Sequence, residues 1–598
     1  MSRRRLLRGL VVLGGLAALW TIVVMWTGGG VWSFGGVRIS SHGPRNPALL
    51  IALSVVLAWA IAAPGQRTHA LAVEYQWLIG RLTRRVPRIP SLAPVAALLA
   101  AVIVAIVGLT EGAGVIGGSD SYGYVSQAHL WTLGVLRQRP VLANALANDV
   151  SLEVLAPLGY RPSVDGTTIA PTYPPGLPMV MAVFEKLTGP ESVFGVVPIL
   201  AAVLVWTTYL LGARLHSPPV GAIAAMLVAT SPPVLVQLTA APLSDVPAAA
   251  WWMLAMVLAT IDRRIGAFGA GAAAGIAILT RPNLAPLAAI VLSLLIWRLT
   301  AAGRSRGHVI QDVTLFSLPA ASACLVIAAI DDVLWGSPLT SGHGPLSTMF
   351  SVSNLWSNVV LYPSVFVQRM PVVLALPVAW LVERRAGHWR LSTDSDRPLL
   401  VALGGFAIVA VLAYIAYPAY DSSSSLRFLI PAVPAVIVLA SLAAFSLAGR
   451  LLETGVPAGL IALVALGGYG VHTARTLGAF DMEHLRRYAV IGRYVDRELS
   501  EDAVLLAMLH SGTATYYSGA PTVRYDLLPP AQLDSLVDTL KQRGYQPYLL
   551  LDTDERLAFQ DRFRGHSRLA ALDWQPLVRL RPPPVEIYSV RAEVTPQP

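Results

Sequence analysis

The sequence predicts an α-helical polytopic membrane protein of about 13 transmembrane helices, followed by a small C-terminal α/β soluble domain. Hydrophobic residues make up 55% of the 598 residues and charged residues only 13%, whereas soluble domains carry roughly 25% charged residues. The mean hydropathy is +0.60. Residues 473–598 break this pattern, because they hold 16 of the 34 acidic residues. We therefore expect a membrane body that ends near Thr473 and a soluble domain after it.

About thirteen apolar runs are long enough to cross a membrane. They lie at 9–26, 47–63, 93–110, 192–211, 219–238, 244–261, 265–280, 284–299, 312–330, 362–382, 399–416, 428–447 and 456–472. With the N-terminus inside, the inner segments hold about twenty Lys and Arg residues and the outer segments about eight, as the positive-inside rule expects. This orientation places the long loop 111–191 outside, and an odd number of spans places the C-terminal domain there too.

These boundaries divide the chain into three parts. Residues 1–90 form an N-terminal transmembrane helix pair and a cytoplasmic loop. Residues 91–472 form the transmembrane body with the large outer loop, and residues 473–598 form the outer soluble domain. We expect the first helix to be an uncleaved span rather than a signal peptide, because only a weak small-residue cleavage site follows it.

The net charge of +10 does not indicate a nucleic-acid partner. Residues 1–472 carry 29 Lys and Arg residues against 18 Asp and Glu residues, and residues 473–598 carry 15 against 16. The positive-inside rule accounts for the excess in the membrane body. The single cysteine, Cys324, excludes an intrachain disulfide and a cysteine-based metal site within this chain.

The C-terminal domain is predicted to be α/β. Residues 503–509, 548–552 and 585–590 are typical of buried strands, and 531–544 (AQLDSLVDTLKQRG) of an amphipathic helix closed by Gly544. A second helix is expected over 555–565. No Gly-rich phosphate loop and no metal-ligand cluster stands in this sequence, so an accessory domain that caps the membrane body is favoured over a second active site.

The outer loop begins with a polar segment, GGSDSYGYVSQAHLW (117–131). On a helix, Asp120, Tyr124, Gln127 and Trp131 share one face. A carboxylate beside aromatic and amide groups at the membrane edge suits a general base that accepts a proton from a hydroxyl or an amine. Asp is also a favoured helix N-cap residue, so a purely structural role stays open.

Further along the same loop stands TIAPTYPPGLPMVMAVFEKL (168–187). Its prolines cannot lie in a regular helix interior, so they predict a fixed turn after which an apolar helix returns to the membrane. The turn is either a simple helix entry or the rigid wall of an outer cavity. In the second case we expect Tyr173 to point into that cavity.

Three more charged residues lie at the ends of predicted spans: Asp245 in PLSDVP, Arg281 in LTRPN and Arg427 in SLRFLIP. Charges at the bilayer edge cost less than charges at its centre, so each can be an interfacial anchor. All three fall on the outer side, however, where the positive-inside rule gives Arg no reason to be. Arg427 is therefore a candidate to hold a phosphate by charge and bidentate hydrogen bonds. For Arg281, phosphate binding and a role as an interfacial anchor are equally favoured.

The outer loop after the ninth predicted span reads IDDVLWGSPLTSGHGP (330–345). Asp331, Asp332 and His343 offer oxygen and nitrogen ligands for a possible divalent metal. Their spacing matches no recognised ligand pattern, so a metal site is the less favoured interpretation.

Together these segments resemble the integral-membrane GT-C glycosyltransferases. The closest likeness is to the branch that contains the protein O-mannosyltransferases, the bacterial aminoarabinose transferase of lipid A and the lipopolysaccharide sugar transferases. Five features occur in the same order: an Asp in the first large outer loop (Asp120), a YPPG turn at 173–176, an LTRPN junction at 279–283, a GSPL segment at 336–339, and a helix start at Arg427 that reads RFLIPAVP. The likeness covers roughly residues 90–450.

This resemblance implies a mechanism. A polyprenyl-phosphate-linked sugar donor enters from the outer leaflet, and Asp120 is the general base that deprotonates a lipid, glycan or protein acceptor. Arg427 and Arg281 hold the lipid phosphate. Tyr124, Gln127, Tyr173, Asp245 and His343 are the remaining candidate substrate-binding residues. The implied location is the bacterial inner or plasma membrane, with membrane lipid and not nucleic acid as partner.

Two other functions stay open. A transporter or flippase of a lipid-linked sugar tends to place ionisable groups near the membrane midplane, whereas the distinctive charges here gather at one face. A non-enzymatic assembly protein that binds through its C-terminal domain leaves the polar residues of the membrane body unexplained.

Overall fold

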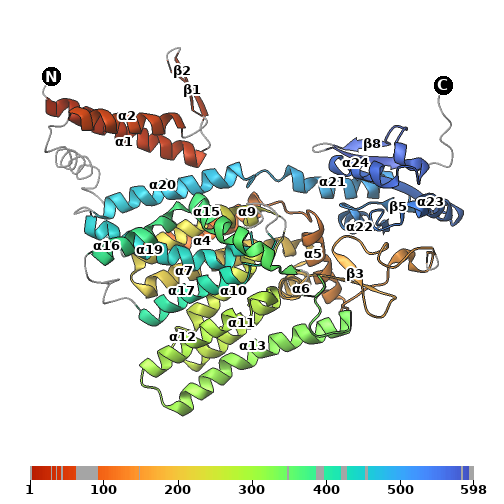
Figure 1. Cartoon of the computed structure of the whole chain (residues 1–598), viewed down its shortest axis with the longest axis horizontal. Helices are drawn as coiled ribbons and strands as arrows, with labels where there is room; N and C mark the ends of the chain where they lie inside the picture. The colour runs from red at the N-terminus through yellow and green to blue at the C-terminus, as the bar shows by residue number, and fades with distance from the viewer. Residues whose placement is uncertain are drawn as a thin grey trace.

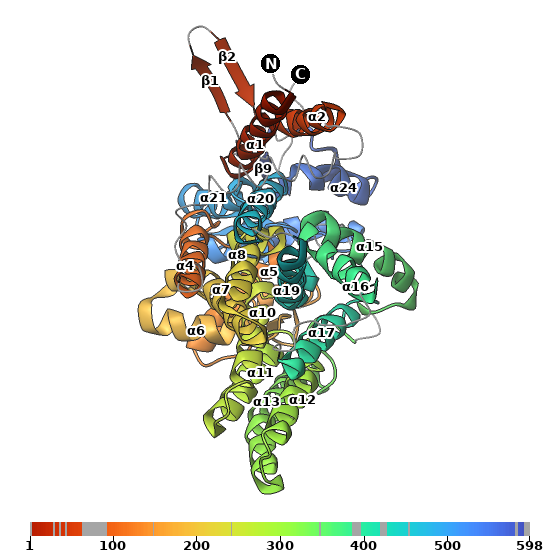
Figure 2. The same cartoon turned by 90° about the vertical axis from the view of Figure 1, so that its left-hand side faces the viewer.

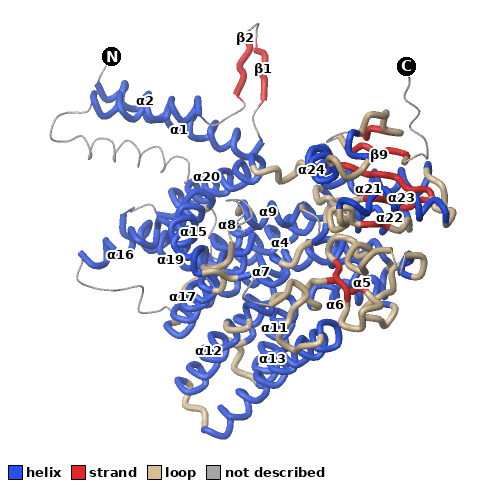
Figure 3. The backbone as a smooth tube through the Cα atoms, turned by 45° about the vertical axis from the view of Figure 1, so that its right-hand side comes forward, coloured by secondary structure: helices blue, strands red, loops and turns tan. Residues whose placement is uncertain are grey.

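The computed structural model describes residues 3–27, 30–34, 37–41, 45–61, 92–146, 149–240, 242–345, 349–385, 396–418, 427–451, 455–580 and 584–590. Within these residues, a helical bundle forms the body, and a small mixed sheet with its helices lies at one end of the bundle (Figure 1). Figure 3 shows that most strands gather at this end, whereas one short hairpin stands apart near the N-terminal helices. The chain is a mostly helical, multi-pass integral membrane protein with a small C-terminal mixed sheet.

The helices of the body coincide with the predicted apolar segments. They are α1 (Arg3–Thr27), α2 (Arg45–Ile61), α4 (Ala93–Thr110), α7 (Val196–Leu215), α8 (Pro218–Ala229), α9 (Pro232–Thr239), α10 (Asp245–Leu258), α11 (Arg264–Thr280), α12 (Leu287–Ala301), α13 (Arg306–Trp335), α15 (Leu355–Arg369), α16 (Ala375–Arg385), α17 (Arg397–Leu412), α19 (Val433–Leu451) and α20 (Gly455–Thr476). Every predicted segment overlaps one of these helices or a consecutive pair.

The predicted number of spans, about 13, is not confirmed. In the described part of the chain, 6 helices are long and apolar enough to cross a membrane, or up to 8 if the bent pairs α8–α9 and α15–α16 each count as one span. Other apolar helices are too short for that test. α10 has 14 residues, and at ~1.5 Å per residue it reaches only about 21 Å of a ~30 Å hydrocarbon core.

The centre of the bundle is α10, which packs against α7 and α11. Most of its side chains are buried, and Trp252, Met253 and Met256 have no exposed surface. α11 in turn packs closely on α13, because its small residues let the two backbones approach. A Cβ atom added at Gly271 would lie 2.2 Å from the Phe316 carbonyl oxygen. The outer face of α13 exposes large apolar side chains, as a lipid-facing helix does.

The outer loop is an ordered subdomain. It contains α5 (Ser119–Thr132), the antiparallel strands β3 (Tyr160–Pro162) and β4 (Ile169–Pro171), and α6 (Gly176–Thr188). The segment at 117–131 contains a helix, α5, as the interpretation of its polar residues assumed, and the helix predicted after the proline turn is confirmed. The hairpin between them was not predicted, since its strands have only 3 residues each.

The C-terminal sheet has the order β6-β5-β7-β9-β8. Its strands are β5 (Ala503–Leu506), β6 (Thr522–Val523), β7 (Gln546–Asp552), β8 (Val578–Leu580) and β9 (Val585–Ser589), and its helices are α21 (Glu483–Glu498), α22 (Ser511–Ser518), α23 (Leu533–Gln542) and α24 (Thr553–Phe563). β5 runs parallel to β6 and β7, whereas β9 is antiparallel to β7 and β8. The three predicted strands and both predicted helices are confirmed; β6, β8, α21 and α22 were missed.

The N-terminal pair α1–α2 lies at the edge of the bundle beside α20 (Figure 2). Trp26 Nε1 donates a hydrogen bond of 3.0 Å to the Val464 carbonyl oxygen of α20. A short antiparallel hairpin, β1 (Gly30–Phe34) and β2 (Val37–Ser41), connects the two helices and was not predicted.

Candidate active site

The site lies where the outer loop meets the bundle, at the start of α5. Asp120 is the second residue of that helix, in the first turn, where the helix dipole favours a negative charge. Gly118 precedes the helix with a φ of +89°, a conformation that residues with a side chain rarely adopt. The backbone therefore turns into α5 at Gly118 and places the half-buried Asp120 in the first turn.

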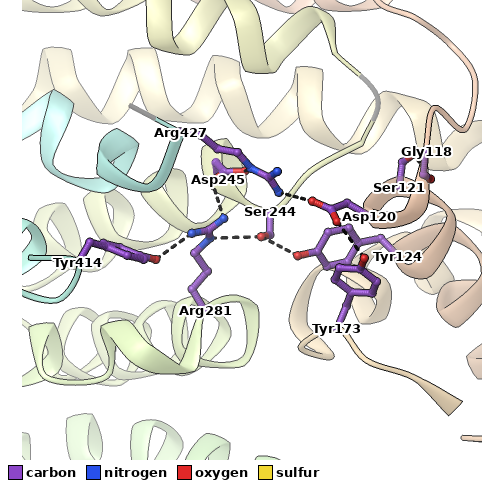
Figure 4. Close-up of polar contacts among 10 residues, drawn as sticks. All are labelled: Gly118, Asp120, Ser121, Tyr124, Tyr173, Ser244, Asp245, Arg281, Tyr414 and Arg427. Carbon is purple, nitrogen blue, oxygen red and sulfur yellow. Dashed lines mark hydrogen bonds and ion pairs between the residues drawn. The ribbon is translucent and has the colours of Figure 1, made fainter. Parts of the chain in front are cut away.

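Four charged side chains form a continuous chain across the site (Figure 4). Asp120 Oδ2 accepts a hydrogen bond of 2.7 Å from an Arg427 terminal nitrogen. Arg427 Nε donates to Asp245 Oδ2 at 2.9 Å, and Asp245 Oδ1 is paired with Arg281. Two carboxylates and two guanidinium groups thus neutralise one another.

Asp245 is the inner member of this chain. Its side chain has 0% exposed surface, and each carboxylate oxygen is held by a different arginine. A buried carboxylate in this setting fixes the two guanidinium groups beside each other, because removal of one partner leaves an uncompensated charge. The geometry makes Asp245 a residue that positions Arg281 and Arg427, and not a wall of the cavity.

Arg281 makes three further contacts that fix its orientation. Its Nε donates to Ser244 Oγ at 3.2 Å, and a terminal nitrogen donates to the Tyr414 hydroxyl at 2.8 Å. Ser244 also accepts a hydrogen bond of 2.8 Å from the Tyr124 hydroxyl of α5. The guanidinium groups of Arg281 and Arg427 both lie over the Phe428 ring, at 5.5 and 5.6 Å from its centroid.

Tyr173 completes the surroundings of Asp120. Its hydroxyl donates a hydrogen bond of 2.8 Å to Asp120 Oδ1. The Tyr173 ring lies against Tyr124, with centroids 4.8 Å apart, and the His343 ring meets it edge-on at 5.5 Å. The YPPG turn and the loop after α13 therefore both reach Asp120.

Burial and these contacts determine the protonation states of Asp120, Tyr173 and His343, which lie in the outer loops. Burial opposes the ionisation of Asp120, but the Arg427 charge and the hydrogen bonds from Arg427 and Tyr173 outweigh it and lower the pKa of Asp120. Burial and then the Asp120 charge raise the pKa of Tyr173. Burial lowers the pKa of His343, so its imidazole is neutral at pH 7. Asp120 is consequently an ionised carboxylate that is paired with the charged Arg427 and hydrogen-bonded by the neutral Tyr173 hydroxyl.

Beside Asp120 lies a cavity of ≈ 460 Å³. Seven of the eight candidate site residues line it, and only Asp245 does not: the seven are Asp120, Tyr124, Gln127, Tyr173, Arg281, His343 and Arg427. Another part of the wall comes from α13 and is mostly apolar, with Ile327, Ile330, Leu334 and Trp335 around a single carboxylate, Asp331. A polar end and an apolar wall in one cavity suit an amphipathic ligand.

Three glycines allow the motif segments to approach one another. A Cβ atom at Gly123 would lie 2.1 Å from the Tyr173 ring, and one at Gly176 would lie 2.3 Å from the Thr280 backbone nitrogen. A Cβ atom at Gly342 would lie 2.5 Å from the Thr172 Cα atom. Since these distances are far below van der Waals contact, side chains at these positions would separate α5, the YPPG turn, the LTRPN junction and the loop after α13.

Sequence patterns missed several residues of the site. Ser244, Tyr414, Tyr417 and Phe428 line the cavity, and Asn283 accepts a hydrogen bond of 3.4 Å from the Tyr414 hydroxyl. Ser244 and Phe428 adjoin charged residues that were predicted, and this adjacency was the available signal. Tyr414 had none, because it lies 133 residues from its partner Arg281. Among the described residues, no group of three or more His, Cys, Asp or Glu side chains is placed to hold a metal ion.

Comparison with known proteins identifies one matching family and several structures of the same fold. Residues 172–327 match the family described as Dolichyl-phosphate-mannose-protein mannosyltransferase. This segment contains Tyr173, Asp245 and Arg281. No curated protein matches the sequence.

Two solved structures share the architecture. ArnT from Cupriavidus metallidurans in the apo state has a TM-score of 0.51 and 15% sequence identity, over 82% of this chain and 97% of that chain. The oligosaccharyltransferase of Archaeoglobus fulgidus, in its complex with Zn and sulfate, has a TM-score of 0.50 and 13% identity, over 82% of this chain and 73% of that chain. These findings confirm the resemblance to the GT-C glycosyltransferases that the ordered motifs indicated: the chain has their membrane fold, and its residues 172–327 carry the sequence pattern of the dolichyl-phosphate-mannose-protein mannosyltransferases.

Proposed function

We propose that this protein is a membrane glycosyltransferase that moves a sugar from a polyprenyl-phosphate donor to an acceptor on the extracytoplasmic face. The observation that carries the proposal is the ionised Asp120 paired with Arg427, with Arg281 in the same chain of charges, in a cavity that also has a mostly apolar wall from α13. The match of residues 172–327 supports it. ArnT from Cupriavidus metallidurans has also been crystallised bound to undecaprenyl phosphate, a ligand of the class proposed here.

In the proposed reaction, Asp120 accepts the proton of an acceptor hydroxyl or amine. The acceptor atom forms a bond to the anomeric carbon of the sugar, and the bond from that carbon to the phosphate oxygen breaks. The lipid phosphate leaves with the bonding electron pair. Arg427 and Arg281 stabilise its charge through charge-assisted hydrogen bonds, which are shorter and stronger than neutral ones.

The ion pair between Asp120 and Arg427 couples donor binding to base strength. In the free protein Arg427 lowers the pKa of Asp120 and makes its carboxylate a weak base. A donor phosphate that takes the Arg427 guanidinium removes this charge and this hydrogen bond from Asp120. The carboxylate then becomes more basic only when the donor is in place, so we expect little deprotonation of the acceptor without it.

Orientation and span number belong to the same proposal. We place thirteen crossings on the thirteen helical segments, which puts the loop 111–191 and residues 473–598 on the outer face of a bacterial inner or plasma membrane. The short helices α10 and α17 are then spans inside the bundle, where protein and not lipid surrounds them. The acceptor is a lipid, a glycan or a protein at that face.

The C-terminal domain has a supporting role in this scheme. The Tyr517 hydroxyl accepts a hydrogen bond of 2.9 Å from the Ile116 backbone N–H, just before α5. The Leu158 N–H donates to Ser511 Oγ at 2.9 Å. A Cβ atom at Gly512 would lie 2.2 Å from the Tyr122 ring of α5. Residues 473–598 therefore pack against α5, the helix that carries Asp120, and stabilise its position.

The test is transfer of label from radiolabelled polyprenyl-phosphate sugars to membrane extract by the purified protein. Asp120→Asn is expected to abolish transfer, because an amide cannot accept the proton, while expression and thermal stability stay near those of the unsubstituted protein. Glu111→Gln is the matched control, since Glu111 is an exposed acid eight residues before α5 and is expected to retain full activity. Full activity of Asp120→Asn would reject Asp120 as the base. Absence of transfer from every donor would favour a transporter of lipid-linked sugars instead.

A further inference from the structure

A second carboxylate faces the same cavity. Asp331 lies on α13, and its side chain forms part of the cavity wall. The cavity-lining residues of α13 are Ile327, Ile330, Asp331, Leu334 and Trp335, spaced by three and four residues, so they form one stripe of the helix. Asp331 lies in the middle of this stripe, with apolar neighbours on both sides.

Asp331 differs from the other two carboxylates of the site. Asp120 and Asp245 are both paired with arginines. Across the ranges that the structure describes, no cation forms an ion pair with Asp331. The Trp335 side chain, one turn further along α13, donates a hydrogen bond to Asp331. A carboxylate without a counter-ion in an apolar stripe of a membrane helix is still costly, and such residues are associated with function.

The end of α13 is held against the segment that carries Tyr173. The Leu334 carbonyl oxygen accepts hydrogen bonds from the Val164 N–H at 2.9 Å and from Ser163 Oγ at 3.0 Å. Residues 163–164 follow β3, which pairs with β4 directly before Tyr173. Asp331 is one turn before Leu334, so it is fixed in the same cavity as the Asp120–Arg427 pair.

The charge balance of the cavity indicates what Asp331 binds. Arg281 and Arg427 are matched by Asp245 and Asp120, and Asp331 adds one unmatched negative charge. An ionised carboxylate only accepts hydrogen bonds. Near Asp331 a phosphate or a sugar carboxylate is repelled, whereas the hydroxyl groups of a neutral sugar are suitable donors.

We propose that Asp331 is a specificity-determining residue that binds the sugar of the donor through its hydroxyl groups, and that it selects neutral sugars against uronic acids. The inference rests on the proposed function and extends it to the substrate class. The lipid phosphate then lies at the arginines, and the sugar lies between them and α13.

The experiment measures binding to the purified full-length protein, without catalysis. The probes are a polyprenyl phosphate without sugar, its mannose conjugate and its glucuronic acid conjugate. Asp331→Asn is expected to weaken binding of the mannose conjugate by roughly tenfold, a typical effect of one or two lost hydrogen bonds to a charged group. Binding of the sugar-free lipid should not change, and binding of the glucuronic acid conjugate should improve.

Asp332→Asn is the matched control. Asp332 is the next residue of the helix, has the same charge, is exposed, and does not line the cavity. It is expected to bind all three lipids like the unsubstituted protein. The gain in binding of the acidic sugar separates the proposal from misfolding, which lowers binding of every ligand.

Two results would overturn the inference: equal loss of binding for the mannose conjugate and the sugar-free lipid, or the same changes in Asp332→Asn. If the unsubstituted protein binds none of the three lipids, the proposed function fails, and this inference fails with it. If it binds them but Asp331→Asn changes nothing, only the role of Asp331 is rejected.

Discussion

At the scale of single residues, the site depends on how a few side chains share protons and charge. Two hydrogen-bond partners of Asp120, Arg427 and Tyr173, stabilise its ionised form, whereas burial opposes ionisation. Tyr173 makes its contribution through one hydroxyl group. Removal of this hydroxyl perturbs Asp120 less than removal of a charged residue would, because all four charges of the site stay in place.

Tyr173→Phe tests this arrangement. Loss of the hydrogen bond raises the pKa of Asp120, so the carboxylate protonates at higher pH, and the acidic limb of the kcat/KM profile moves to higher pH. At neutral pH, where the carboxylate is still ionised, we expect kcat/KM to fall by roughly tenfold, equivalent to ~1.4 kcal/mol, because Asp120 loses the hydrogen bond that fixes its orientation. A pH series of transfer rates measures both effects.

Tyr160→Phe is the control for that series. The Tyr160 hydroxyl donates to Ser126 Oγ at 2.7 Å and does not contact Asp120. Its acidic limb should coincide with that of the unsubstituted protein. A Tyr173→Phe limb that stays in place or moves to lower pH would contradict the assignment.

At the scale of elements, close backbone contacts decide whether the motifs meet. The YPPG turn reaches the LTRPN junction only because Gly176 has no side chain: its Cβ atom would lie 2.3 Å from the Thr280 nitrogen and 2.5 Å from the Leu279 carbonyl carbon. Both neighbours are backbone atoms, which cannot rotate away. α6 and α11 are therefore locked together at the point that places Tyr173 near Arg281.

Gly176→Ala should consequently impair both folding and transfer. Overpacking of this kind typically costs about 1–3 kcal/mol, and we expect a lower melting temperature and a transfer rate at least ~10-fold lower, equivalent to ~1.4 kcal/mol. Gly404→Ala in α17 is the control, because nothing lies within 4 Å of a Cβ atom there. Alanine favours helix by about 1 kcal/mol over glycine, so the control should be neutral or stabilised. Equal behaviour of the two variants would show that the contact is unimportant.

At the scale of the whole molecule, the outer loop and the C-terminal domain share one hydrophobic core. Leu142, Leu146, Val154 and Leu155 of the loop are buried in the same cluster as residues of β5, β7 and α23. The Arg524 N–H also donates to the Val154 carbonyl oxygen at 2.8 Å. Two segments more than 300 residues apart thus fold as a single unit around the start of α5.

Leu146→Ala is expected to destabilise this unit by about 2–5 kcal/mol, as is usual for a fully buried leucine. Hydrogen exchange should then increase in β5 and β7, although the substitution lies in the loop. Val141→Ala is the control, since Val141 is 72% exposed. Exchange that rises only within the loop 111–191 would show that the two parts are independent.

The proposed orientation is tested with single cysteines in a Cys324→Ser background. Cysteines at Val164 in the outer loop and at Leu577 in the C-terminal domain, both exposed positions, should react from outside with a membrane-impermeant thiol reagent. A cysteine at Arg304, also exposed, should react only after permeabilisation. Labelling of Arg304→Cys in intact cells would reverse the topology.

Much of this arrangement was predictable from local patterns. Apolar runs located every helical segment of the body, and the residues Asp120, Tyr173, Arg281 and Arg427 were identified from charges and prolines at span ends. The span count was less secure, because hydropathy does not distinguish a helix that faces lipid from a short helix such as α10, which is surrounded by protein. Strands of two or three residues, such as β6 and β8, contain too few positions for an alternating pattern.

The sequence by itself determined that this chain enters a membrane, where its helices lie, and which side chains have unusual charge for their position. Those properties are local, because hydropathy and helix periodicity depend on neighbouring residues. Only the tertiary structure decided that Asp245 is a buried counter-ion, that Tyr414 orients Arg281, and that Asp120 pairs with Arg427 across 307 residues of sequence. These contacts depend on which backbones approach closely, and that is set by the packing of distant segments.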